Sequence, residues 1–135
     1  MSWRFIDTDR VDGYYSAALF ESIARHVGAG EVEETILFWR VKTPVVYIGY
    51  HQYVEDEIHE DYCTDNGVQV IRRVLGGGCG FCDENQILFS IIGREESGAI
   101  PSNIQGAYSC VLKGVTNTLV SLGFDGELEP TRNAV

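Results

Sequence analysis

The chain has 135 residues, 44% of them hydrophobic and 11% aromatic, so it is long and apolar enough to fold around a core. Twenty acidic residues against ten basic ones give a formal net charge of −10, which argues against a nucleic-acid-binding protein because such proteins need a basic face. No apolar run is long enough to cross a membrane, no signal-peptide pattern opens the chain, and four cysteines are too few for a disulfide framework. We therefore expect a cytoplasmic protein.

The first part of the chain predicts a strand, a helix and two further strands. Residues 3–6 are strand-like, and Asp12 offers N-cap chemistry for a helix over residues 13–27. The apolar side chains of this helix fall on one stripe, namely Tyr15, Leu19, Ile23 and Val27. Residues 35–41 and 45–50 are strand-like, and the short turn between them predicts a hairpin or at least neighbouring strands.

The rest of the chain predicts two helices and three strands. Residues 54–66 form an acidic amphipathic pattern with Val54, Ile58 and Tyr62 facing inward, and its carboxylates are expected to be a solvated face. The later elements are expected, in order, as strands over 68–74 and 86–92, a loop over 93–103, a helix over 104–122 and a weak strand over 124–129. The apolar stripe of the long helix is Tyr108, Val111, Leu112, Val115, Leu119 and Leu122.

This mixed order of strands and helices predicts one α/β (α+β) domain over residues 1–135. No internal repeat, low-complexity tract or interdomain linker interrupts it. We expect a mixed, largely antiparallel sheet flanked by helices.

The most informative stretch joins the strand over 68–74 to the strand over 86–92. Two arginines, Arg72 and Arg73, precede the run Gly76-Gly77-Gly78. Consecutive glycines let backbone amides approach a ligand closely, often an anion, and arginine adds charge-assisted contacts to phosphate or carboxylate. Taken alone, the same stretch could also be only a tight connection between strands.

The pattern Arg72-Arg73-x-x-Gly76-Gly77-Gly78-x-x-Phe81-x-Asp83, followed by Phe89-Ser90, resembles the signature of the lipoate–protein ligase A family. The family's usual text there is Arg-Arg-x-Ser-Gly-Gly-Gly-Ala-Val-Phe-His-Asp. Other landmarks agree in order: Arg4-Phe5-Ile6-Asp7 with the helix segment 17–21, Val46 to Gln52, Leu122-Gly123-Phe124, and Arg132-Asn133.

The resemblance implies the fold shared by biotin and lipoate ligases, related to class II aminoacyl-tRNA synthetases and here truncated at the C-terminal end: a partial BPL/LPL-type catalytic domain. Such ligases activate lipoate with ATP to lipoyl-adenylate. They pass the acyl group to a lysine of a carrier, either an oxoacid dehydrogenase E2 domain or the glycine cleavage H protein. ATP and lipoate or octanoate are thus the expected substrates, with Asp83 and Glu84 as candidate Mg²⁺ ligands.

By position, the resemblance also implies which residues line the acyl-adenylate pocket. Arg73 would contact the carboxylate or phosphate, beside Arg72. The backbone of Gly76, Gly77 and Gly78 would border the acyl chain and the phosphate. The other lining residues would be Cys79, Phe81 and Cys82, with Asn133 on the nucleotide side.

Three departures from the family pattern bear on activity. Leu75 stands where the family has serine, and Cys82 stands where it has histidine. The sequence ends at Val135, before the family's Lys-x-Ser-Gly segment, whose lysine stabilises the transferring acyl-adenylate. We therefore expect a fragment, half of a split enzyme, or a degenerate relative, with no catalytic residue assigned and the isolated chain weak or inactive.

Cys79-x-x-Cys82 leaves a second reading open, because this spacing also suits a metal or redox site. One pair gives half of a tetrahedral site, so pocket-lining cysteines are favoured over an acyl-accepting thiol, and both over a metal. The favoured hypothesis is the N-terminal portion of a lipoate–protein ligase A-like enzyme. The alternatives are a cysteine-dependent octanoyl or lipoyl transferase, and a non-catalytic subunit that pairs with a complementary ligase chain, whose strand would complete an edge at residues 127–135.

Overall fold

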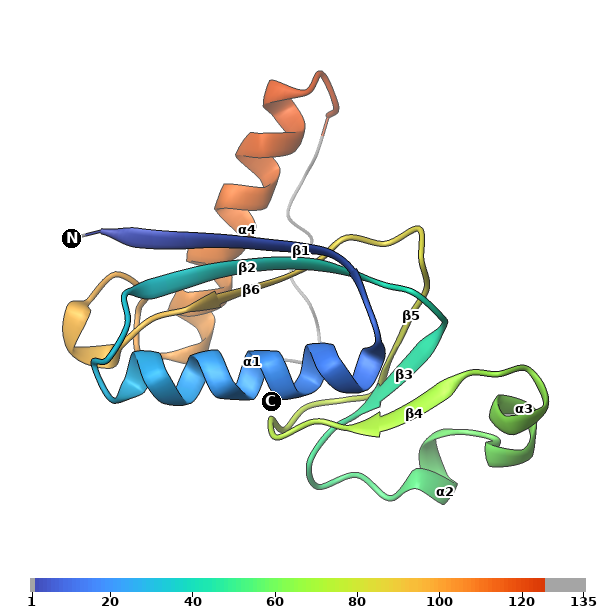
Figure 1. Ribbon diagram of the computed structural model, residues 1–135. Coiled ribbons are helices and arrows are strands. Elements are labelled where there is room, and N and C mark those ends of the chain that lie inside the picture. The colour runs from blue at the N-terminus through green and yellow to red at the C-terminus, as the bar shows by residue number, and fades with distance from the viewer. Residues whose placement is uncertain (1, 126–135) are drawn as a thin grey trace. The chain divides into compact units, whose positions relative to one another are not determined.

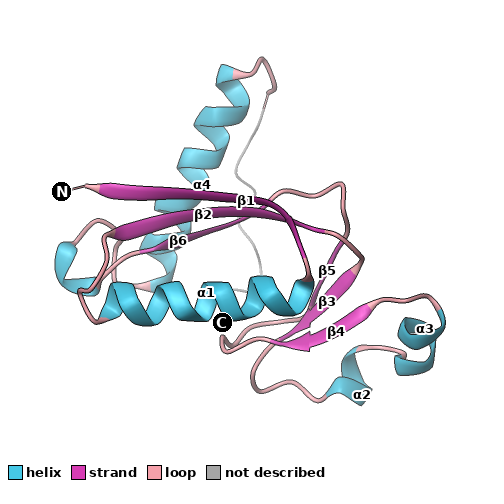
Figure 2. Cartoon of the chain, viewed as in Figure 1, coloured by secondary structure: helices cyan, strands magenta, loops and turns pink. Residues whose placement is uncertain are grey.

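The structure is a computed structural model that describes residues 2–125 (Figure 1). The chain divides into two compact units, Met1–Ile92 and Gly93–Val135. Figure 2 shows the helices and strands of each. Within the described part of the chain, no helix combines the length and the apolarity needed to cross a membrane.

The first sheet of the larger unit has the strand order β1-β2-β6. Strands β1 (Trp3–Val11) and β2 (Glu34–Val41) are parallel, whereas β6 (Leu88–Ile92) runs antiparallel to β2. Helix α1 (Gly13–Gly28) connects β1 to β2 and lies along one face of the sheet (Figure 1). A parallel pair requires such a crossover, so the helix and the strand direction explain each other.

The two faces of this sheet have different surroundings. Ile23 and Val27 of α1 pack on Leu37 and Ile92 of the sheet to form a buried cluster. Side chains alternate along a strand, so Phe38 faces away from α1. On that face the rings of Phe5, Phe38 and Phe89 form a row across the strands, with neighbouring centroids 5.4 and 5.8 Å apart.

The second sheet has the order β4-β3-β5. Strand β3 (Val45–Ile48) is central and wholly buried, parallel to β4 (Gln69–Arg72) and antiparallel to β5 (Gly80–Cys82). Two short helices, α2 (Val54–Glu57) and α3 (Glu60–Asp65), join β3 to β4. Val45, Tyr47 and Ile71 of this sheet form a buried cluster with Val41 from the end of β2.

The smaller unit holds a 3₁₀ turn, η1 (Glu95–Ser97), and helix α4 (Ile104–Ser121). The side chain of Asn103 caps α4 by accepting a hydrogen bond from the Gly106 amide at 2.7 Å. None of the helix's described side chains is buried.

The mixed α/β fold class expected from the sequence is confirmed, and the Asp12 N-cap of α1 is present. The expected hairpin of residues 35–41 and 45–50 is wrong, because β2 and β3 belong to different sheets. Both strands instead take parallel partners supplied by helical crossovers. The four residues of β3 are buried because β3 lies between two strands, as its continuous apolar run indicated.

Three local expectations are also corrected. The single helix over 54–66 is broken, because Ile58 adopts an extended backbone (φ −143°, ψ 160°), and Cys63 is buried while Tyr62 is 65% exposed. Tyr15 is exposed rather than part of the inward stripe of α1. The segment between β4 and β6 contains a short strand, β5, that the sequence did not indicate. The weak strand expected over 124–129 falls almost wholly outside the described residues.

Candidate functional site

Two loops meet at the ends of the parallel strands β3 and β4. Ile48 pairs with Arg72 in the register of these strands, and the Arg73 amide donates to the Ile48 carbonyl at 2.9 Å. Beyond the strands, the Tyr50 amide donates to the Leu75 carbonyl, also at 2.9 Å. The loop over residues 49–52 (the 49–52 loop) therefore runs beside the loop over residues 73–78 (the glycine loop).

Arg72 directs its guanidinium at the 49–52 loop. Its Nη1 lies 3.0 Å from the Gly49 carbonyl oxygen, 3.1 Å from that of Tyr50 and 2.7 Å from that of Gln52. Three carbonyl dipoles thus point their negative ends at one cationic nitrogen.

Arg73 directs its guanidinium at the glycine loop instead. Its Nη2 donates to the carbonyls of Gly76 at 3.0 Å and Gly78 at 2.6 Å. Among the described residues, its Nε is buried without a hydrogen-bond partner. A buried donor without a partner is costly to the fold.

The glycines of the two loops have different structural roles. A β-carbon on Gly49 would lie 2.0 Å from the Gly77 carbonyl oxygen, so the loops touch backbone to backbone there. Gly77 has φ +93°, a left-handed conformation that favours glycine. A β-carbon on Gly76 or Gly78 would meet no described atom within 4 Å. Their backbone therefore borders open space.

Cys79 and Cys82, which follow the glycine loop, lie in different surroundings. Cys79 is exposed, whereas Cys82 is half-buried and packs on the core of the second sheet. Although Cys79 is exposed overall, partial desolvation of its thiol raises the pKa, and the Glu57 carboxylate raises this pKa further. Burial also raises the pKa of Cys82, with a smaller rise from the charge of Asp83. A raised pKa disfavours the thiolate form of both cysteines, which suits a lining role better than a nucleophilic one.

Apolar side chains lie within the glycine loop and in the segment that follows it. The exposed ones on this segment are Val74, Leu75, Phe81 and Ile87. Phe81 lies on β5 opposite Val46 and is 55% exposed. Apolar groups that flank an arginine-bearing loop suit a ligand with a charged head and an aliphatic chain.

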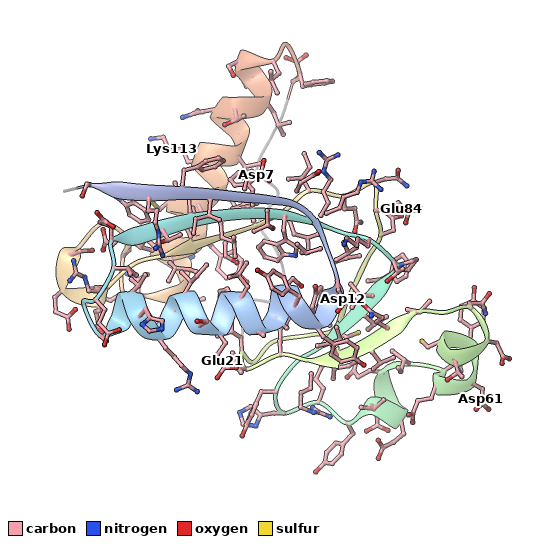
Figure 3. All side chains as sticks on the ribbon, in the orientation of Figure 1. Asp7, Asp12, Glu21, Asp61, Glu84 and Lys113 are labelled. Carbon is pink, nitrogen blue, oxygen red and sulfur yellow. The ribbon has the colours of Figure 1, made fainter. Side chains whose placement is uncertain are left out.

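The remaining candidates have simpler surroundings. Glu84 lies between β5 and β6 (Figure 3), and Asp83 forms a turn in which its Oδ1 accepts from the Asn85 amide at 2.9 Å. The described residues bring together no group of three or more His, Cys, Asp or Glu side chains that could hold a metal ion. The Mg²⁺ role of Asp83 and Glu84 stays a prediction, and Asn133 lies outside the described residues.

Sequence reasoning did not identify the structural roles of Gly49 and Gln52. The Gln52 side chain accepts from the Gly49 amide at 2.8 Å and shapes the loop that meets Gly77. The one available signal was the glycine that directly follows a buried strand. The effect of Glu57 on the pKa of the Cys79 thiol was also missed, because the two residues lie far apart in sequence.

A sequence profile of the lipoyl protein ligase A/B catalytic domain matches residues 12–135. The chain belongs to this family. Octanoyltransferase LipM of Staphylococcus aureus (strain NCTC 8325) is 32% identical over 124 residues, which are 92% of this chain and 45% of that protein. The chain therefore spans less than half the length of this curated relative.

Solved structures of lipoate ligases share the fold. A putative lipoate protein ligase from T. acidophilum with bound lipoic acid has a TM-score of 0.80 at 29% identity, covering 100% of this chain and 55% of that one. Lipoate-protein ligase A bound with ATP has a TM-score of 0.81 at 29% identity, with 100% and 54% covered. The bi-partite lipoate protein ligase from Thermoplasma acidophilum, described with its E2 lipoyl domain, has a TM-score of 0.81 at 28% identity. The match covers 96% of this chain and 49% of that one. The family expected from the residues is confirmed.

Proposed function

We propose that this chain forms the N-terminal part of a lipoate–protein ligase that binds lipoate or octanoate as its adenylate and takes part in protein lipoylation. The observation that best supports this proposal is the position of Arg73, whose guanidinium donates to the carbonyls of Gly76 and Gly78 where the backbone of these glycines borders open space. An acyl phosphate oxygen in that space would lie beside the guanidinium, which can neutralise its negative charge.

In the proposed reaction a carboxylate oxygen of the acyl acid forms a bond to the α-phosphorus of ATP. The bond from that phosphorus to the bridging oxygen breaks, and pyrophosphate leaves. An acceptor lysine amine then attacks the acyl carbon, and AMP leaves. Arg73 and the backbone of Gly76 and Gly78 would hold the negative charge of the phosphate during the first step.

The partner implied by this proposal is a lipoyl-acceptor domain that carries the lysine. The bi-partite T. acidophilum ligase supports a second requirement, namely a further segment or chain that completes the enzyme. The chain's coverage of about half of each relative agrees with that requirement.

Calorimetric titration with a non-hydrolysable octanoyl-adenylate analogue tests the binding half of the proposal. The chain should bind it, and Arg73→Gln should weaken affinity by about 10- to 100-fold, the range for a lost charge-assisted hydrogen bond. Arg25→Gln, which removes an exposed arginine paired with Glu21 on α1, is the matched control and should bind normally. An affinity of Arg73→Gln equal to the wild type would contradict the proposal.

The catalytic half is tested by ATP–pyrophosphate exchange with lipoate or octanoate. The observation that favours a second candidate, direct octanoyl transfer between proteins, is the likeness to octanoyltransferase LipM. That candidate predicts transfer of octanoate from a carrier protein to an acceptor lysine without ATP. Exchange that depends on the acyl acid supports the ligase, whereas ATP-independent transfer supports the transferase.

A further inference from the structure

The Arg72 guanidinium forms hydrogen bonds with backbone carbonyls of the protein. One nitrogen, Nη1, is shared among the carbonyls of Gly49, Tyr50 and Gln52, at 2.7–3.1 Å. Three carbonyl oxygens that converge on one point repel one another unless a cation sits between them. A neutral side chain at position 72 would leave this convergence uncompensated, so the cation holds the 49–52 loop in its turn.

The 49–52 loop in turn fixes the glycine loop at two points. The Tyr50 amide donates to the Leu75 carbonyl at 2.9 Å, and the α-carbon of Gly49 lies against the Gly77 carbonyl. Gly77 is itself close to Arg73, since a β-carbon there would lie 3.1 Å from the Arg73 Nη2. A continuous set of contacts therefore leads from Arg72 through the 49–52 loop to Gly77 and Arg73.

We propose that Arg72 is a positioning residue, which holds the glycine loop in its ligand-binding shape through the 49–52 loop, while Arg73 is the arginine that faces the ligand. This inference rests on the proposed function, because it names the adenylate site as the place where the effect is felt. The division of roles follows from strand geometry, since consecutive residues at a strand end point to opposite faces.

Two variants of Arg72 and one of Arg73 separate positioning from contact. Hydrogen exchange of the Tyr50 amide, measured without ligand, reports whether the 49–52 loop still closes on Leu75. Titration with the octanoyl-adenylate analogue, well below the melting temperature of each variant, reports affinity. A residue that contributed only to global stability would not change affinity under those conditions.

Arg72→Gln should speed hydrogen exchange of the Tyr50 amide. It should also weaken binding of the analogue by roughly tenfold, the size of effect transmitted through a contact network. Arg72→Lys restores a cation among the carbonyls, so it should recover part of the slow Tyr50 exchange and part of the affinity for the analogue. Arg73→Gln should weaken binding and leave Tyr50 exchange at the wild-type rate. Should Arg72→Gln fail to fold, the same two measurements on Arg72→Lys decide, with intermediate values expected.

Two results would overturn the inference: unchanged Tyr50 exchange in Arg72→Gln, or faster exchange with wild-type affinity. The first shows that Arg72 does not hold the loop, and the second shows that the loop does not shape the ligand site. If the wild-type chain binds no analogue, the proposed function fails together with the ligand part of this inference. Tyr50 exchange in the unliganded variants still decides whether Arg72 holds the 49–52 loop.

Discussion

Gly49 and Gly77 touch backbone to backbone, so closely that a β-carbon on Gly49 would lie 2.0 Å from the Gly77 carbonyl oxygen. This contact joins the end of a buried strand to the centre of the glycine loop. Because the blocking atom belongs to the backbone, no side-chain rotation can relieve the clash. The glycine at position 49 is therefore a requirement of the loop pairing.

Gly49→Ala should separate the two loops and lower the free energy of unfolding by about 1–3 kcal/mol, as for other overpacked sites. Urea unfolding followed by tryptophan fluorescence measures this. The control is Gly28→Ala at the end of α1, where a β-carbon meets no described atom within 4 Å. That variant should stay within about 0.5 kcal/mol of the wild type. Equal stability of the two variants would show that the loops are not in contact.

The three consecutive glycines of the loop should respond differently to alanine. Gly77→Ala forces a side chain into a left-handed backbone and should cost about 1–2 kcal/mol of stability. Gly76→Ala and Gly78→Ala meet open space and should leave stability unchanged or slightly higher. Thermal unfolding of the three variants provides the measurement.

Ligand affinity should divide the same glycines in another way. If Gly76 and Gly78 border the acyl-adenylate, an added methyl group at either position should weaken binding of the octanoyl-adenylate analogue by roughly tenfold or more. Their intact stability excludes unfolding as the cause. Normal affinity in both stable variants would place the ligand away from the glycine loop.

The sequence predicted individual helices and strands better than it predicted which strands pair with each other. Helix α1 with its Asp12 cap and the strands β2 and β3 follow from local patterns that depend on nearby residues only. The pairing of β2 and β3 was mispredicted because a three-residue connection suits a hairpin and a corner equally. Which one forms is decided by strands β1 and β4, which reach β2 and β3 through helical crossovers.

The candidate site shows the same limit. The Arg-Arg and triple-glycine run identified the loop, and the alternation of strand side chains could have indicated that Arg72 and Arg73 diverge. The role of Gly49 could not be predicted from the sequence, because a glycine after an apolar run is also typical of an ordinary strand end. Its partner, Gly77, is brought to it only by the parallel register of β3 and β4.

A buried hydroxyl pair joins α1 to β3. The Ser16 Oγ donates to the Gly13 carbonyl at 2.7 Å, so the Tyr47 hydroxyl donates to Ser16 Oγ across their 2.6 Å separation. Ser16→Ala leaves the Tyr47 hydroxyl buried without its acceptor and should cost about 1–3 kcal/mol. The double variant with Tyr47→Phe removes both groups and should be more stable than the sum of the single changes predicts. Additive effects in urea unfolding would contradict this coupling.

Asp12 links the start of α1 to β4 and should make stability sensitive to acid. The hydrogen bond from the Gln69 side chain, at 2.8 Å, is the main reason that the pKa of Asp12 lies below its ordinary value. A lowered folded-state pKa gives a contribution that is complete above about pH 4, the ordinary pKa of aspartate, and is lost as pH falls through the folded-state value. The melting temperature of the wild type should therefore fall more steeply with pH below about pH 4 than that of Asp12→Asn. Asp56→Asn on exposed α2 is the control and should follow the wild type.

Glu57 should suppress the reactivity of Cys79. After partial desolvation of the thiol, the Glu57 carboxylate is the next cause of its raised pKa, and only the thiolate reacts rapidly with alkylating reagents. Glu57→Gln should therefore speed the alkylation of Cys79 at pH 8, measured for each cysteine by peptide mass mapping. Glu55→Gln, a neighbouring change on α2, should leave the rate unchanged. Equal rates in all three proteins would show that Glu57 does not act on the thiol. The expected result disfavours Cys79 as an acyl-accepting nucleophile, because a catalytic thiol needs neighbours that lower its pKa.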